Sequence, residues 1–219
     1  MKSPTHICKS CFCNFNEGSF HSLFNSTTLC NKCLKEYNPI FKKFKIENIE
    51  ALAIYEYEGK VKENIFIFKG CGDYELKDTF LSSFSTDLRI MFWNFIILPA
   101  PSSEESNLKR GFNHVKEIFS ILGLPMYEIF KKISNHKQSN LSYLERQKVN
   151  KVLSIDDGEI IKNKNVLIVD DICTTGATLK ALINLIKPFN PKQIKVLVIA
   201  KRDMSEDEIN KIKNSHKIL

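Results

Sequence analysis

Two pairs of cysteines near the N-terminus have the spacing of metal ligands. Cys8 and Cys11 form one Cys-x-x-Cys pair, and Cys30 and Cys33 form a second pair, separated from the first by 18 residues. Each pair places two thiolates on one turn, and four thiolates complete the tetrahedron that Zn²⁺ prefers. Because no ligand position is left for a substrate, we expect this zinc to be structural. The alternative is two disulfides, which require an oxidising compartment.

Other cysteines are less informative. Cys13 and His21 lie close to the pairs and could substitute as ligands, but they break the paired pattern. Cys71 and Cys173 stand alone, and we expect both to be small packing residues.

A second stretch places two carboxylates shortly before a run of small residues that includes three threonines. Asp170 and Asp171 follow four aliphatic residues and precede the run Thr174–Thr178. Gly176 lets backbone N–H groups approach an anion, and the threonine hydroxyls can donate to its oxygens. Two acids beside an anion make sense if they face a neutral polyol, or a Mg²⁺ ion bridging to one. A sugar phosphate with free ribose hydroxyls meets these demands; an ordinary strand–turn–helix connection is the alternative.

The elements that must position these residues alternate between strands and helices. Apolar runs predict strands at 51–57, 95–98, 166–169 and 194–199, with an edge strand at 152–155. Helical spacing predicts helices near 61–68, 76–88, 112–122, 143–150 and 179–186, and a basic terminal helix carrying Lys211, Lys213 and Lys217. Residues 102–109 are expected to form a polar loop. This alternation implies a mostly parallel α/β sheet, with the loops after Leu98 and Val169 opening on the same edge.

Composition narrows the class of protein further. The 219 residues suit one substantial domain with a small appendage, and the net charge of +7 is compatible with a polyanionic partner. Lys42, Lys43 and Lys45 are interleaved with Phe41 and Phe44, a pattern that can bind single-stranded nucleic acid. A solvated connector with inward-facing phenylalanines explains that pattern equally well. Neither an apolar run long enough to span a membrane nor a signal peptide is expected, which favours the cytoplasm.

The Asp170–Thr178 stretch resembles the phosphoribosyl-pyrophosphate (PRPP) loop of type I phosphoribosyltransferases. In that family the acids hold the ribose 2′- and 3′-hydroxyls and the loop holds the 5′-phosphate. The order of motifs resembles a narrower family, the competence protein ComF (ComFC) family. The matching series is the four-cysteine knuckle, Phe68-Lys69-Gly70, Leu98–Pro101, Arg110–Asn113, Gln138–Leu141, Glu145-Arg146 with Asn150, and the Asp170-Asp171 loop.

This resemblance implies a zinc knuckle at 1–38 and a type I phosphoribosyltransferase-like domain at 39–219. It implies a PRPP site with Mg²⁺ made by Asp170, Asp171, Cys173, Thr174, Thr175, Gly176, Ala177 and Thr178. Ala100, Pro101 and Ser102 would line the pyrophosphate side. Lys109 and Arg110 could neutralise pyrophosphate; the alternative for Arg110 is a structural role at the start of a helix. Gln138, Arg146 and Asn150 match the family without revealing a role.

The function implied is that of a cytoplasmic, PRPP-binding competence protein needed for import of single-stranded DNA. Its implied partners are PRPP, single-stranded DNA and membrane-associated DNA-import and helicase proteins, with a peripheral position at the inner membrane. The alternative is a genuine phosphoribosyltransferase with an unidentified acceptor. Residues 200–203 lead into a charged segment without an aromatic residue, so no nucleobase-reading segment is apparent. Whether the protein is an enzyme therefore stays open at this point.

Overall fold

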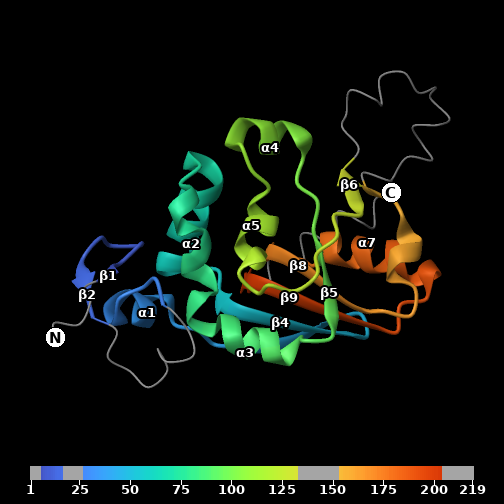
Figure 1. Cartoon of the computed structure of the whole chain (residues 1–219), viewed down its shortest axis with the longest axis horizontal. Helices are drawn as coiled ribbons and strands as arrows, with labels where there is room; N and C mark the ends of the chain where they lie inside the picture. Colours follow the sequence, from blue (N-terminus) through green and yellow to red (C-terminus); the bar gives the residue numbers. More distant parts are fainter. Residues whose placement is uncertain (1–5, 17–26, 133–152, 204–219) are drawn as a thin grey trace.

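A five-stranded sheet forms the centre of the molecule in the computed structural model, which describes residues 6–16, 27–132 and 153–203 (Figure 1). The strands lie in the order β3-β4-β9-β8-β5. Their bounds are Lys42–Ile46 (β3), Ile49–Glu56 (β4), Gln193–Lys201 (β9), Asn165–Cys173 (β8) and Phe95–Pro99 (β5). β4, β9, β8 and β5 are parallel, and β3 joins β4 antiparallel. The expected mostly parallel sheet is confirmed.

Helices cover the two faces of this sheet. On one face, α2 (Gly59–Phe66), α3 (Ser85–Met91) and α5 (His114–Ser120) pack on an apolar cluster that includes Leu167 and Val169. On the other face, α7 (Ala177–Ile186) packs on Val166 and Ile168. We call these the α2 face and the α7 face. Burial on both faces explains why residues 166–169 are all apolar.

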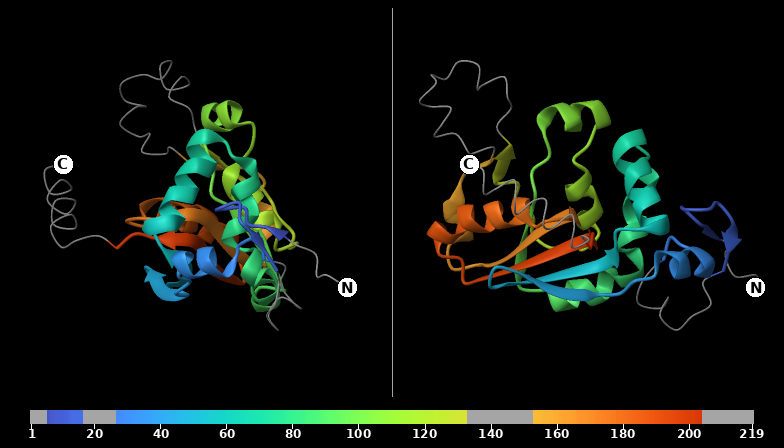
Figure 2. Two further views of the ribbon diagram at one scale, coloured as in Figure 1. Left: turned by 90° about the vertical axis from the view of Figure 1, so that its left-hand side faces the viewer. Right: turned by 180° about the vertical axis from the view of Figure 1, so that it is seen from behind.

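Smaller elements surround this core. β1 (His6–Ile7), β2 (Asn14–Phe15) and α1 (Asn31–Tyr37) form the knuckle, at the opposite end of the long axis from α7 (Figures 1 and 2). β6 (Phe130–Lys132) and β7 (Leu153–Ile155) pair in a separate two-stranded sheet. α4 (Glu104–Arg110) stands between β5 and α5. Across the described helices, no segment is long and apolar enough to cross a membrane.

Three sequence expectations need correction. The basic connector at 42–45 is strand β3, because Phe44 and Ile46 alternate with the lysines and can bury one side. The expected loop at 102–109 contains α4, whose start is capped by Ser103 Oγ accepting from Ser106 N (3.2 Å). The expected helix at 76–88 is broken into 3₁₀ segments, Tyr74–Phe80 and Ser82–Phe84, before α3 begins.

The knuckle packs against the main domain. Tyr37 of α1 lies in the same apolar cluster as Tyr55 and Phe80, and its hydroxyl donates to Thr79 Oγ1 (3.1 Å). Asn64 Nδ2 of α2 donates to the same hydroxyl (2.6 Å). The division into 1–38 and 39–219 stays a prediction, since these contacts join the two parts through one core.

Several expectations lie outside the described residues. They are the helix at 143–150 with Arg146 and Asn150, the residues Gln138 and His21, and the terminal lysines 211, 213 and 217.

Candidate functional site

The four predicted zinc ligands come together. The Sγ atoms of Cys8, Cys11, Cys30 and Cys33 all lie within 4.8 Å of one another. Four sulfurs bound to one Zn²⁺ at about 2.3 Å lie about 3.8 Å apart, and the Cys11–Cys30 separation is 3.7 Å. Cys8 Sγ also accepts from the backbone N–H of Cys30 (3.3 Å), which fixes one turn against the other. The donor set therefore fits a tetrahedral metal ion such as zinc.

Cys13 is a fifth thiol at the edge of this cluster. Its Sγ lies 3.3 Å from Cys11 Sγ, and it is exposed like Cys11. The remaining ligands are almost fully buried, with Cys8 0% and Cys33 1% exposed. The two Cys-x-x-Cys pairs therefore identify the four cysteines that come together. Cys13 lies beside Cys11, the exposed one of the four.

The predicted anion loop lies between β8 and α7. Thr174, Thr175 and Thr178 are exposed at the carboxyl end of β8, where parallel sheets bind their ligands. Gly176 has φ +76° and ψ +5°, a left-handed conformation that residues with a Cβ rarely adopt. This turn aims the first N–H groups of α7 outward. The loop can therefore accept a phosphate.

A cleft of about 810 Å³ opens beside this loop. Its walls come from β3, the end of β9 and the start of α7, and the basic residues Lys180, Lys201 and Arg202 line it. Lys45 also contributes to the wall, although its side chain belongs to the other side of β3. Glu47 and Asp203 are the acids, paired with Lys180 Nζ (3.1 Å) and Lys201 Nζ (2.7 Å) respectively. Cys173 lines the floor, where burial raises the pKa of its thiol. The excess of basic side chains suits an anionic ligand.

The two acids have different surroundings. Asp170 is half-buried, and burial together with the neighbouring Asp171 charge raises its pKa well above the ordinary value. Asp171 is 4% exposed, and its Oδ2 lies 2.6 Å from Lys69 Nζ and 3.0 Å from His114 Nε2. Although burial opposes ionisation, these two partners hold the pKa of Asp171 below its usual range. The carboxylate of Asp170, with the threonine hydroxyls, offers the oxygen ligands that Mg²⁺ prefers.

The predicted pyrophosphate side lies on the neighbouring strand. β5 and β8 are paired in parallel with Pro99 opposite Val169, and Ala100 N donates to Val169 O (2.8 Å). The two loops therefore open on the same edge, as predicted. We call this carboxyl edge of β5 and β8, where the two predicted loops open, the ligand edge. Ala100 is buried, Pro101 and Ser102 are half-buried, and Lys109 is exposed near the end of α4. Arg110 Nε donates to Lys69 O (3.0 Å), so this guanidinium holds the protein backbone.

The three lysines predicted to bind DNA do not share a face. Lys42 pairs with Glu56 (2.9 Å) and Asp203 (2.6 Å) near the ligand edge. Lys43 and Lys45 point to the other side of β3, because successive side chains of a strand alternate.

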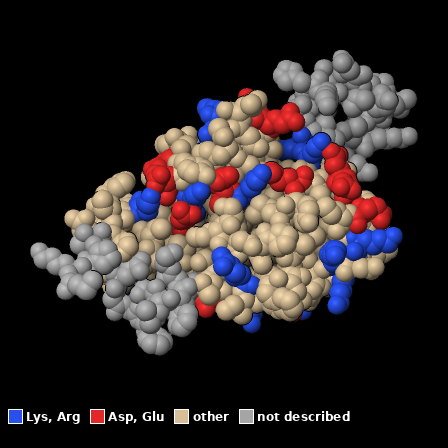
Figure 3. Space-filling view, viewed as in Figure 1, with Lys and Arg blue, Asp and Glu red and all other residues tan. Residues whose placement is uncertain are grey.

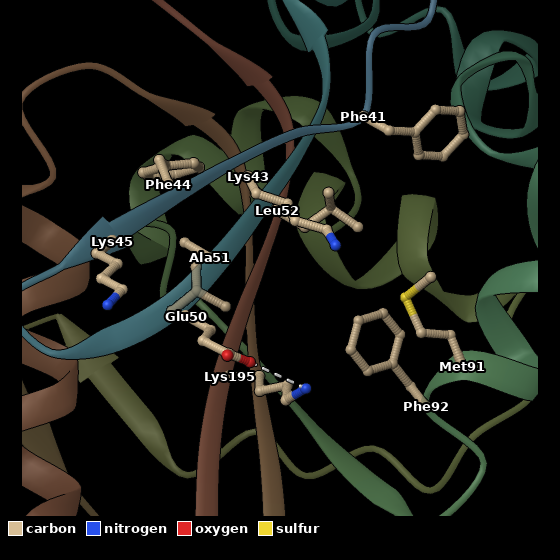
Figure 4. Close-up of a pocket in the computed structure, with 11 residues that line it drawn as sticks. Phe41, Lys43, Phe44, Lys45, Glu50, Ala51, Leu52, Met91, Phe92 and Lys195 are labelled. Carbon is tan, nitrogen blue, oxygen red and sulfur yellow. Dashed lines mark ion pairs between the residues drawn. The ribbon is translucent and has the colours of Figure 1, made fainter.

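Lys43 and Lys45 line a groove of about 560 Å³ on the α2 face (Figure 4). Phe41, Leu52, Met91 and Phe92 give it apolar walls, and Lys195 adds a third ammonium group, paired with Glu50 at 3.1 Å. Elsewhere, acidic and basic side chains are interspersed on the face seen in Figure 3. The groove therefore combines apolar surface with a basic rim.

Sequence reasoning missed two residues at the ligand edge, Lys69 and His114. Lys69 was noted only as part of a family motif, and His114 carried no signal because a lone histidine at a helix start has no diagnostic spacing. Both reach Asp171 from elements that are distant in the sequence. Only the packing of α2 and α5 on the same face could reveal them.

The sheet and its loop define an α/β protein with a glycine-containing turn at the carboxyl edge of parallel strands, in a position suited to an anion. A family model, the phosphoribosyl transferase domain, matches residues 108–218, about half of the chain. The chain belongs to that family.

Curated relatives support the resemblance to ComFC proteins. Competence protein ComFC of Bacillus subtilis is 30% identical over 129 residues, which cover 58% of this chain and 53% of that protein. The chain thus spans about half the length of this relative. Competence protein ComFC of Streptococcus pneumoniae is 25% identical over 199 residues, 88% of each chain. Among solved structures, a purine phosphoribosyltransferase from Pyrococcus horikoshii covers 67% of this chain and 76% of its own, with 19% identity and a TM-score of 0.34.

Proposed function

We propose that this chain is a PRPP-binding competence protein that serves the import of single-stranded DNA into the cytoplasm during natural transformation. The observation that carries the proposal is the exposed threonine loop at the start of α7, opening on the same sheet edge as Asp170 and the loop after β5. A phosphate and a polyol could be bound there side by side. The names of the two ComFC relatives support the process.

Each part of PRPP has a candidate partner. The loop from Cys173 to Thr178 would hold the 5′-phosphate. By the resemblance to type I phosphoribosyltransferases, Asp170 and Asp171 would hold the ribose hydroxyls. Residues 100–102 with Lys109 and Arg110 would face the pyrophosphate. Asp170 and the threonine hydroxyls would offer oxygen ligands to Mg²⁺, which would neutralise part of the pyrophosphate charge.

Isothermal calorimetry with PRPP, with and without Mg²⁺, tests this site. We expect binding to the wild type and a loss of about tenfold or more in Asp170→Asn, since charge-assisted hydrogen bonds contribute about 1.5–3 kcal/mol. Inorganic phosphate should compete, because the loop is an anion site by itself. Asp87→Asn, on α3 and away from the β8–α7 loop, is the matched control. Unchanged affinity in Asp170→Asn would contradict the placement.

A genuine phosphoribosyltransferase is the second candidate. Adjacent loops for the two ends of PRPP on β5 and β8 favour it, because transfer needs the ribose and the leaving pyrophosphate held together. Release of pyrophosphate from PRPP, assayed with pools of small-molecule acceptors, separates the two. Release of pyrophosphate with one of the pools would support the phosphoribosyltransferase. Binding of PRPP without release of pyrophosphate in every pool would support the competence protein.

Contact with single-stranded DNA would take place in the groove lined by Phe41, Lys43, Lys45, Met91 and Lys195. Its apolar walls could receive bases while the ammonium groups follow the phosphates. Lys42 does not line this groove, since it faces the other side of β3 and pairs with Glu56 and Asp203. The +7 net charge adds general attraction.

Fluorescence anisotropy with a labelled single strand tests the groove. Binding should weaken as salt rises, and Lys43→Glu with Lys45→Glu should lower the salt slope by about 1.4, about 0.7 for each lost phosphate contact. Lys42→Gln on the opposite face is the control and should keep the slope. An equal effect of all three changes would point to general charge attraction without a groove.

The cellular role has its own test. A clean deletion should leave DNA capture at the cell surface intact and block arrival of the strand in the cytoplasm. Normal transformation in the deletion strain would end the competence proposal. Cell fractionation of a tagged protein would test the cytoplasmic location, with a peripheral fraction at the inner membrane if DNA-import and helicase proteins are partners.

A further inference from the structure

The two adjacent acids of β8 belong to opposite faces of the sheet. Along β8, Val166 and Ile168 pack on the α7 face, whereas Leu167 and Val169 pack on the α2 face. Lys69 and His114, which belong to elements on the α2 face, contact Asp171 and place its side chain on that side. Asp170, its neighbour in the strand, points to the opposite side, toward α7. Consecutive strand residues therefore do not present equivalent carboxylates to one ligand.

Both oxygens of Asp171 already have partners within the protein. Oδ1 accepts from the backbone N–H of Ile172 (2.8 Å). Oδ2 lies 2.6 Å from Lys69 Nζ and 3.0 Å from His114 Nε2, and the side chains of Asp171 and His114 are 6% and 7% exposed. A carboxylate this buried depends on such partners, because an uncompensated charge in the interior costs several kcal/mol.

Arg110 fixes the orientation of His114. Its Nη1 lies 2.9 Å from His114 Nδ1, and a guanidinium can only donate, so Nδ1 accepts. The ring proton is therefore on Nε2, the nitrogen that lies 3.0 Å from Asp171 Oδ2. Arg110 Nε donates in addition to the backbone oxygen of Lys69 (3.0 Å).

These contacts form a closed circuit of four residues. Lys69 comes from a π-helical turn, Ile67–Cys71, that extends α2. Arg110 ends α4, His114 begins α5, and Asp171 lies in β8, two residues after the apolar run 166–169. Turns of π-helix inside longer helices often occur at functional sites. The circuit joins the predicted pyrophosphate side to the predicted ribose side.

We propose that Asp171 is a positioning residue, which holds Lys69 and His114 at the ligand edge, and that Asp170 alone meets the ribose hydroxyls. This inference rests on the proposed PRPP site and changes the role of one residue in it. It also removes a difficulty, because two free carboxylates beside a phosphate loop would repel the ligand. The positive charge of Lys69 compensates the negative charge of Asp171, so that Asp170 is the acid left to face the ribose. The loop between β8 and α7 can then bind a phosphate without repulsion from Asp171.

Charge rescue tests the proposal, with PRPP affinity measured by calorimetry. Lys69→Met leaves Asp171 buried without its cation, so PRPP affinity should fall about tenfold or more. The double variant Lys69→Met with Asp171→Asn removes the leftover charge, and affinity should recover most of that loss. If Asp171 instead held a ribose hydroxyl, the double variant would bind more weakly than Lys69→Met alone. That result would overturn the proposal.

A matched pair gives the control. Lys69→Met combined with Asp170→Asn should show no recovery, because Asp170 is expected to contact the ligand directly. Thermal unfolding gives a second, ligand-free reading: the melting temperature should fall in Lys69→Met and rise again in the double variant with Asp171→Asn. If the wild type bound no PRPP, the PRPP proposal would fail, while this thermal rescue would still decide whether the four residues act as one unit.

Discussion

The thiolate cluster and the threonine loop hold their reactive groups in opposite ways. In the knuckle, three of the four sulfur ligands are at most 5% exposed, and all four face one another. In the loop before α7, the exposed side chains of Thr174 and Thr175 line a cleft of about 810 Å³. The first arrangement can hold only an ion between its own atoms, whereas the second needs an external ligand to satisfy it. Stability should therefore depend on the first and ligand binding on the second.

The largest effect should come from opening the closed cluster. Cys8→Ser and Cys33→Ser should each lose the bound metal, measured by atomic emission, and the knuckle should unfold. Structural zinc contributes about 10 kcal/mol or more in isolated fingers. Because α1 shares a core with Tyr55 and Phe80, the melting temperature of the whole chain should also fall.

Two control variants sharpen this result. Cys71→Ser removes an exposed cysteine that is far from the cluster in sequence, and Cys13→Ser removes the thiol next to Cys11. Both should keep one equivalent of metal. Equal loss in Cys13→Ser would mean that the ion is shared among five thiols, and the cluster would no longer be the closed four-ligand site.

The next largest loss of stability should appear at high pH, where the phenol of Tyr37 ionises in the contact between the knuckle and the main domain. Burial raises the pKa of Tyr37 to about 12, compared with about 10 in the unfolded chain. Because the unfolded chain loses this proton at a lower pH than the folded protein, the contribution of Tyr37 to stability is complete below about pH 10. About 2–3 kcal/mol of the free energy of unfolding is lost as the pH rises to about 12. Tyr37→Phe should remove this part of the pH dependence in urea unfolding. Tyr127→Phe, which removes a phenol that is 37% exposed, is the control.

A smaller effect on stability should follow from changing the open loop. Gly176→Ala forces a side chain into φ +76°, which costs about 1–2 kcal/mol, and PRPP binding should weaken because the turn shifts. Gly70→Ala is the matched control, since its added Cβ would meet only the Phe66 ring at 3.8 Å. Urea midpoints for both variants give the comparison. A loss of stability with unchanged ligand binding would separate the turn from the anion site.

The smallest effect should come from the exposed ion pairs at the ligand edge. Hydrogen bonds from Lys201 and Lys42 lower the pKa of Asp203 to about 2. A lowered folded pKa stabilises the protein above about pH 4, and this contribution is lost as pH falls toward 2. Since these groups are exposed, Lys42→Gln should cost less than about 1 kcal/mol, and less still in high salt. A larger effect would mean that the edge is more rigid than its exposure suggests.

The sequence predicted those parts whose signal is local. Each Cys-x-x-Cys turn brings two of the four thiols together within a few residues. The apolar run before Asp170 predicts a buried strand. The shared opening of the loops after β5 and β8 also followed, because parallel neighbours end on one edge. These predictions needed only spacing and hydrophobicity.

The remainder depended on contacts between distant residues. Lys42, Lys43 and Lys45 looked like one basic patch, but strand pairing with β4 sends Lys42 to one side and the other two to the opposite side. Lys69 and His114 meet Asp171 only because α2 and α5 pack on the same face. Helix α4 is the exception, because its signals are local: Ser103 caps its start, and Glu104 and Glu105 in the first turn interact favourably with the positive end of the helix dipole.

Strand β3 is an outermost strand of the five-stranded sheet, and three of its five residues are lysines. A free strand edge can pair with the edge of another chain and seed aggregation. Lysine side chains discourage such pairing, because two copies docked edge to edge would bring like charges together. The lysines of this strand therefore protect an exposed sheet edge from pairing with another copy of the chain, whatever ligand they contact.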